Sequence, residues 1–244
     1  MTNTCTSTAG LLPVVLFASA YVAADSVAAQ SRGSDPFEPA RRVLQERCVA
    51  CHAAPEPEAG LALGSWGAVM SGSDYGEAVI PFDSENSLLV EMITKLVDGP
   101  HPGEQGAPIL VEREIETLRT WIDKGARSPD GAIPFADATE LLYVTNQGEA
   151  TVSVIDMETN MVVRTVDLTA LGFSEGSMPH HIAVEPDGSY WYVSLIVANS
   201  ILKFDRHNNL VGQVAFDRPG LLALDPTGDL LFAARSMISA NPPQ

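Results

Sequence analysis

The chain has 244 residues, of which 45% are hydrophobic and 18% charged, a composition typical of folded material arranged as one large domain or two modest ones. Its formal net charge of -17 argues against a nucleic-acid-binding surface, because the protein and the polyanion would repel each other. An acidic surface instead suits a protein outside the cytoplasm, or one that docks with a basic partner.

The N-terminal segment predicts export. Residues 10–24 are almost wholly apolar or small and are followed by Asp25, a length that fits the apolar region of a secretory signal and is short for a membrane span. Small residues at 27–29 offer a cleavage site, with 22–24 as the alternative, so we expect a signal peptide over 1–29 and a periplasmic or otherwise exported protein. No Lys or Arg precedes the apolar run, and the alternative is a retained N-terminal anchor that would hold the protein at a membrane.

A Cys-x-x-Cys-His run, the attachment signature of a c-type haem, occupies residues 48–52. Two thiols on one helical turn, Cys48 and Cys51, can both bond to the porphyrin vinyl groups, and the adjacent His52 then lies under the iron as its proximal ligand. The alternative, a zinc half-site, would need a second pair of ligands. The third cysteine, Cys5, lies in the predicted signal peptide, and the other two are committed to the haem, so no disulfide is expected. The motif therefore predicts one covalent haem c, which is attached outside the cytoplasm and so agrees with export.

The first predicted helix leads into this motif. It opens at Asp35-Pro36 and carries an apolar stripe that comprises Phe37, Ala40, Val43, Leu44, Cys48 and Cys51. The haem would thus be attached at the C-terminal end of the helix. A looser stretch rich in Gly, Pro and Ser follows over residues 53–87 and contains Trp66 and Tyr75, which we interpret as pocket wall or as donors to haem propionates.

Two further helices complete the predicted N-terminal half. One runs over residues 87–97 and stops at Gly99-Pro100, and the other spans 111–124, with Gly125 as its C-terminal stop. Three helices around a covalent haem describe a small class I-like cytochrome.

This region resembles the planctomycete-type cytochrome c domain over about residues 36–130. The resemblance rests on the order of four segments, namely Cys48 to His52, Gly60-Leu61-Ala62-Leu63, Ser87-Leu88-Leu89 and Glu114-Ile115-x-x-Leu118-x-x-Trp121-Ile122-Asp123-x-Gly125-Ala126. In that family a Met-Pro-Pro stretch just before the last helix usually supplies the sixth iron ligand. The corresponding residues here, 99–106, contain no methionine.

The sixth, distal ligand is therefore an open question at this stage. His101 lies close to where the family's methionine would be, between two prolines, and is our first choice. Met92 on the preceding helix is the alternative, although its apolar stripe also suits a core residue, and Met70 is a weaker candidate. An open sixth site is the remaining possibility. The choice matters because a thioether ligand raises the haem potential relative to imidazole, whereas an open site would permit small-molecule binding.

From about residue 139 the helical stripes give way to short β-branched runs separated by turns. Strands are predicted over residues 140–145, 151–155, 161–166, 181–184, 190–194, 200–204, 210–215, 221–224 and 230–233. The turns carry Asp, Pro, Gly and Asn where tight turns need them, as in Glu185-Pro186-Asp187-Gly188.

Three segments of this half, 141–146, 189–194 and 229–234, recur at roughly forty to fifty residues, the period of a propeller blade. The half is similar to the YVTN-type β-propeller repeat, whose naming tetrapeptide is Tyr143-Val144-Thr145-Asn146. About two and a half blades are visible, the first of them starting at its second strand, whereas closure needs at least about four. We therefore expect a truncated ring, and the alternative is a complete small sheet packed on the haem domain.

The predicted fold class is thus α plus all-β with two domains, a small helical class I-like cytochrome c domain followed by a partial β-propeller. The expected boundaries are 1–29 for the signal peptide, 30–130 for the mono-haem domain, 131–138 for a linker and 139–244 for the propeller. Within the propeller, His180-His181 suggests a metal site, with His207 as a further ligand. Adjacent residues on a strand point to opposite faces, so we interpret the pair as ordinary strand residues.

These features favour an exported electron-transfer protein in which a propeller platform holds a redox partner protein or a substrate near the haem. One alternative is a haem-dependent oxidoreductase with its active site in the propeller, for which the visible blades show no acid, base or nucleophile constellation. The other is a binding or sensor module that recognises a protein or glycan through the propeller. No nucleic-acid partner is expected.

Overall fold

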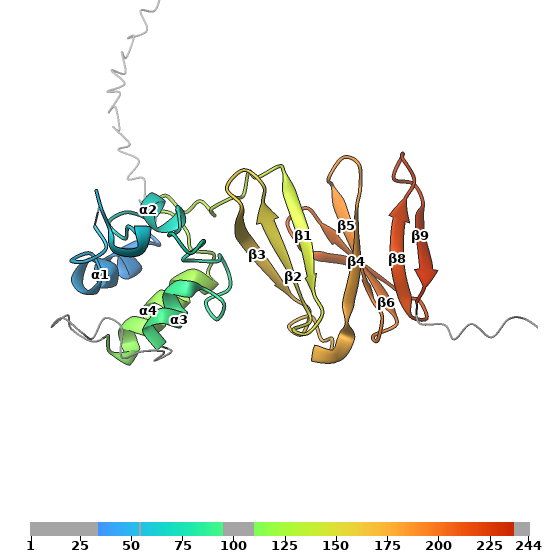
Figure 1. The fold of residues 1–244 in the computed structure, drawn as a ribbon, viewed down its shortest axis with the longest axis horizontal. Coiled ribbons are helices and arrows are strands. Elements are labelled where there is room, and N and C mark those ends of the chain that lie inside the picture. Colours follow the sequence, from blue (N-terminus) through green and yellow to red (C-terminus); the bar gives the residue numbers. More distant parts are fainter. Residues whose placement is uncertain (1–33, 54, 95–109, 237–244) are drawn as a thin grey trace, which may run out of the picture. The chain divides into compact units, whose positions relative to one another are not determined.

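The computed structural model describes residues 34–53, 55–94 and 110–236. The predicted signal peptide and His101 lie outside these ranges. Figure 1 shows helices in the N-terminal part of the described chain and strands in the C-terminal part, so the predicted combination is confirmed: a small helical region is followed by an all-β region. Within the described ranges, no helix combines the length and apolarity that a membrane span needs.

Helix α1 spans Glu38–Arg47 and forms the wall of the helical core. Its apolar positions recur at helical spacing, and Phe37, Ala40, Val43 and Leu44 are buried as predicted. The helix ends at Arg47, however, and Cys48 is already its C-terminal cap. The prediction that the stripe continues to Cys51 is therefore wrong, because the chain turns away from the helix axis before that residue, which is exposed.

Helix α4 spans Glu112–Asp123 and packs against α1. Leu118, Trp121 and Ile122 point into the core, and the Trp121 ring lies 5.1 Å from the ring of Phe37. Lys124 caps the helix and Gly125 follows with a φ of +97°, a conformation that glycine adopts without strain. A Cβ at this position would lie 2.6 Å from the ring of Phe82, so both the backbone and the packing require glycine here.

Two shorter α-helices and a 3-10 turn complete the helical region: α2 (Trp66–Met70), α3 (Leu88–Thr94) and η1 (Glu58–Gly60). Helix α2 lies in the stretch predicted to be loose. Its N-cap, Ser65, accepts a hydrogen bond from the backbone N–H of Ala68, and Val69 and Met70 are buried. The helices share one core with residues from the connecting segments.

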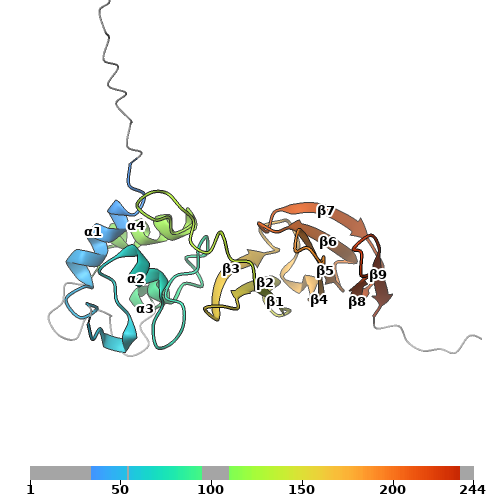
Figure 2. The same cartoon turned by 90° about the horizontal axis from the view of Figure 1, so that it is seen from above.

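The β region consists of three antiparallel sheets in the described chain (Figures 1 and 2). The first holds β1 (Leu141–Asn146), β2 (Thr151–Asp156) and β3 (Met161–Asp167). The second holds β4 (Pro179–Val184), β5 (Tyr190–Leu195), β6 (Ser200–Asp205) and β7 (Leu210–Ala215), and a 3-10 turn, η2 (Glu175–Ser177), precedes it. The third holds β8 (Pro219–Leu224) and β9 (Leu231–Arg235). Every predicted strand is present within two residues of its expected bounds.

The sheets repeat one local design. By its repeated sequence, β1 corresponds to β5 and β9. Strands β5 and β9 pair with the preceding strands β4 and β8, whereas β1 pairs only with the following strand β2 among the described strands. This agrees with the prediction that the first repeat starts at its second strand. β4 and β8 each begin at a proline, a position where a strand needs no donor. The residue before each proline has a positive φ, 54° at Met178 and 48° at Arg218.

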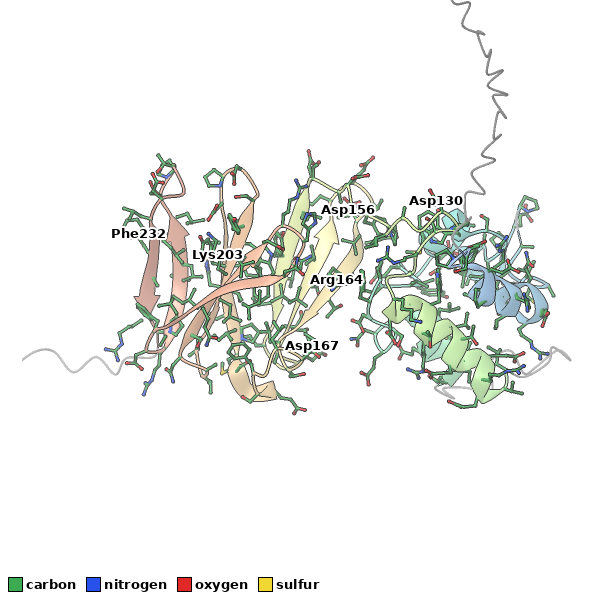
Figure 3. The ribbon with its side chains drawn as sticks, turned by 180° about the vertical axis from the view of Figure 1, so that it is seen from behind. Asp130, Asp156, Arg164, Asp167, Lys203 and Phe232 are labelled. Carbon is green, nitrogen blue, oxygen red and sulfur yellow. The ribbon has the colours of Figure 1, made fainter. Side chains whose placement is uncertain are left out.

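Aromatic packing joins the first two sheets. Trp191 on β5 is fully buried and stacks on Phe204 of β6 with ring centroids 4.3 Å apart, while the ring of Tyr143 on β1 lies 4.9 Å from that of Trp191. On the second sheet Lys203 (Figure 3) lies 3.7 Å above the ring of Tyr190 and donates to Glu185 at 3.1 Å. The β region therefore has its own core, distinct from that of the helices.

Candidate haem site

The Cys-x-x-Cys-His run forms one tight turn directly after α1. The backbone N–H groups of Cys51 and His52 both donate to the carbonyl of Cys48, at 3.2 and 3.0 Å, and the N–H of Cys48 donates to Leu44 at 2.9 Å. The turn is thereby anchored to the last turn of the helix. Cys48 is half-buried and Cys51 exposed, so both thiols and the imidazole belong to one short, fixed segment at the predicted place, the C-terminal end of α1.

His52 is held in one orientation. The residue is only 8% exposed, and its Nδ1 lies 3.1 Å from the carbonyl oxygens of both Glu58 and Leu61. Carbonyl oxygens only accept hydrogen bonds, so this pairing assigns the ring proton to Nδ1. The lone pair then belongs to Nε2, the arrangement that metal-binding histidines use. The backbone carbonyl of His52 also accepts from the N–H of Leu63 at 2.9 Å, which fixes the main chain at this residue.

This donor set fits a covalent haem. Two thiols lie on one turn, and a buried imidazole with a defined tautomer follows them directly. In the described part of the chain, no three His, Cys, Asp or Glu side chains gather as they would around a metal ion held by protein alone. Such a cluster is not what a haem needs, since the porphyrin supplies four of the iron ligands.

The Cys48 thiol has an unusual environment. Burial raises its pKa to about 11, the nearby Arg47 guanidinium opposes this shift, and the Glu114 carboxylate adds to it. Cys48 therefore carries its proton at neutral pH, which makes its sulfur a poor nucleophile toward oxidants and alkylating agents.

An ion pair that the sequence analysis did not single out lies beside this thiol. Glu114 in the first turn of α4 is 8% exposed, and its Oε1 accepts from Nε and Nη2 of Arg47 at 3.0 and 2.7 Å. Its Oε2 accepts from the backbone N–H of Val111 at 2.9 Å, as in a capping box. The position of Glu114 near the start of a predicted helix is the signal that would have marked it as a cap. Its pairing with Arg47, 67 residues away, has no local signal.

The two methionines considered as distal iron ligands differ in their burial. Met92 on α3 is 44% exposed, so the expectation that it could be an ordinary core residue is wrong. Met70 on α2 is 8% exposed and belongs to the helical core. His101 lies outside the described residues, and the choice among distal ligands stays a prediction.

Trp66 and Tyr75, which the sequence analysis interpreted as pocket wall or as propionate donors, differ in their surroundings. Trp66 donates its indole N–H to the carbonyl of Ala126 at 2.8 Å, a bond that ties α2 to the segment after α4. Tyr75 is 81% exposed.

In the β region, His180 and His181 occupy consecutive positions of β4. His181 Nδ1 accepts from the backbone N–H of Leu222 on β8 at 3.2 Å, and Nδ1 of His180 is buried without a hydrogen-bond partner. His181 thus has a structural task, since it joins the second and third sheets.

Comparison with known proteins supports the helical part of this description. Residues 48–101 match the family model described as Planctomycete cytochrome C. The matched residues include the Cys-x-x-Cys-His turn and helices α2 and α3, so this part of the chain is similar to a planctomycete cytochrome c domain. The match begins at Cys48, and a cytochrome c domain of this family implies haem c binding. No curated protein matches the chain.

Among solved structures, the chain is similar to hydrazine synthase of Kuenenia stuttgartiensis (23% identity, TM-score 0.35) over 41% of this chain and 27% of that one. It is also similar to a functionally unknown protein of Desulfotomaculum acetoxidans (24%, 0.30) and to virginiamycin B lyase of Staphylococcus aureus (13%, 0.33), each over 39% of this chain and 31% of the other. The chain thus spans less than a third of the length of each.

Proposed function

We propose that this protein is an exported mono-haem c-type cytochrome that transfers single electrons through one covalently bound haem. The observation that carries the proposal is the turn after α1, where two cysteines are followed by a buried histidine whose Nδ1 faces two backbone carbonyls. The match to the planctomycete cytochrome c model over the same residues supports it.

Each residue of the turn has a task in this function. Cys48 and Cys51 would hold the porphyrin through thioether bonds, and His52 would bind the iron through Nε2. The hydrogen bonds to Nδ1 orient the imidazole and increase its basicity, so its position is set before the haem arrives. When bound, the haem supplies an iron that alternates between Fe(II) and Fe(III).

For the opposite face of the haem we propose His101 as distal ligand, with Met92 as the alternative. An imidazole and a thioether give different ferric spectra, because only thioether ligation produces a weak charge-transfer band at the red end of the visible range. The partial propeller would serve as the platform that holds a redox partner protein or a substrate. With a net charge of -17, the chain suits a partner with a basic docking surface.

Redox titration of exported, purified protein tests the proposal. We expect a reversible transition that involves one electron per chain and is followed in the visible haem bands. Absence of a reversible haem transition in exported protein that carries haem would contradict electron transfer. Binding of carbon monoxide to the reduced protein without any ligand exchange would point to an open sixth site and favour an enzyme or sensor instead.

A further inference from the structure

The Arg47–Glu114 ion pair links the C-terminal end of α1 to the N-terminal end of α4, directly before the haem motif. Arg47 is the last residue of α1 and directly precedes Cys48, and Glu114 lies in the first turn of α4. The side chains are 24% and 10% exposed, so water screens the pair incompletely. Both carboxylate oxygens of Glu114 accept hydrogen bonds, one from Arg47 and one from the Val111 backbone.

Both charges act on the sulfur of Cys48. After burial, which raises its pKa most, the two largest influences on this thiol are the Arg47 guanidinium, which lowers the pKa, and the Glu114 carboxylate, which raises it. The same sulfur would carry one thioether bond to the porphyrin. A haem attached at Cys48 would therefore have two opposite charges near its point of attachment.

We propose that Arg47 and Glu114 each shift the reduction potential of the haem, in opposite directions, because their ion pair holds one positive and one negative charge beside the Cys48 attachment. This inference rests on the proposed function, since it concerns the same haem. Oxidation removes one electron from Fe(II) to the redox partner and leaves Fe(III) with one more positive charge. The Glu114 carboxylate stabilises that charge and Arg47 destabilises it, so in the intact pair the two effects largely cancel.

Removing one charge leaves the effect of the other charge on the reduction potential uncompensated. In Glu114→Gln the Arg47 charge stays unopposed, and the reduction potential should rise. In Arg47→Gln the Glu114 carboxylate stays unopposed, and the potential should fall. The double variant Arg47→Gln/Glu114→Gln removes both charges, and its potential should return toward that of the wild type. These opposite signs separate a charge effect from loosened packing, which would shift both single variants in one direction.

The test is a set of redox titrations on exported full-chain protein at pH 7.5. Glu38→Gln serves as the control, because Glu38 also forms ion pairs on α1 but lies about 14 Å along the helix from Arg47. It should leave the potential unchanged. The amide introduced by Glu114→Gln can still accept from the Val111 N–H, as glutamine does in capping boxes, and thermal unfolding of each variant checks the fold.

A further variant covers the case in which Arg47→Gln does not fold. Arg47→Lys keeps the charge and loses the two-point hydrogen bonding, so it should lower stability with little change in potential. Single variants whose potentials move in the same direction, or do not move, would overturn the proposal. If the wild type carries no covalent haem, the proposed function fails instead, and the two failures are thus distinguishable.

Discussion

At the scale of single residues, the two cysteines of the haem motif differ although they share one turn. Cys48 is half-buried with a pKa of about 11, and Cys51 is exposed. Alkylation requires an accessible thiolate, so in haem-free protein at pH 8 iodoacetamide should label Cys51 at least about tenfold faster than Cys48. Peptide mapping by mass spectrometry measures both rates. Equal rates in the folded protein would contradict this environment, and in urea the difference should vanish.

Glu114 predicts a pH dependence of stability. The hydrogen bonds from Arg47, and then the Val111 N–H, hold its pKa below the ordinary range, while partial burial opposes the shift. A carboxylate whose pKa is lowered by folding stabilises the native state above its unfolded-state pKa, about 4.3, and this contribution is lost as the pH falls through the folded-state pKa. The stability difference between wild type and Glu114→Gln, measured by urea unfolding, should therefore be largest near pH 7 and shrink below about pH 4. A stability difference between the two proteins that grows toward acid pH would contradict a lowered pKa of Glu114.

At the scale of elements, the end of α4 depends on one glycine. Gly125→Ala places a Cβ against the Phe82 ring in a left-handed backbone conformation, and we expect a loss of about 1–3 kcal/mol in the free energy of unfolding. Gly67 within α2 is the matched control, because no atom lies within 4 Å of a Cβ there. Gly67→Ala should be neutral or stabilising by up to about 1 kcal/mol. Thermal or urea unfolding compares the two, and equal effects would count against the packing at Gly125.

In the β region, the bond from the Leu222 N–H to His181 Nδ1 joins β8 to β4. His181→Leu removes the acceptor and should cost about 1–2 kcal/mol. His181→Asn offers an oxygen near the position of Nδ1 and should recover much of the loss. Hydrogen–deuterium exchange of the β8 segment reports the change directly. Unchanged protection of β8 in His181→Leu would show that the bond contributes little.

At the scale of the whole molecule, the sequence predicted the β region and three of the four described α-helices because their signals are local. Alternation of apolar residues and Asp, Pro and Gly turns mark each strand, and strands β4 and β8 were placed two residues late because they begin at Pro179 and Pro219, which usually interrupt strands. Helix α2 was missed because five residues in a Gly- and Ser-rich stretch carry little helical pattern.

Of the candidate site, the haem-binding motif could be predicted from the sequence. Cys48, Cys51 and His52 form a contiguous motif, and their turn lies where the sequence placed it, at the end of α1. The partners that orient and surround them were not predictable. The carbonyls that fix His52 belong to backbone that follows the motif, and the pairing of Arg47 with Glu114 arises only when α1 and α4 pack together.

Mass spectrometry of the exported full-chain protein tests the central claim most directly. We predict a haem covalently attached to the peptide that contains Cys48 and Cys51, and no attached haem when both cysteines are replaced by serine. An exported wild-type protein whose Cys48–Cys51 peptide has its unmodified mass would contradict the assignment of this chain as a c-type cytochrome.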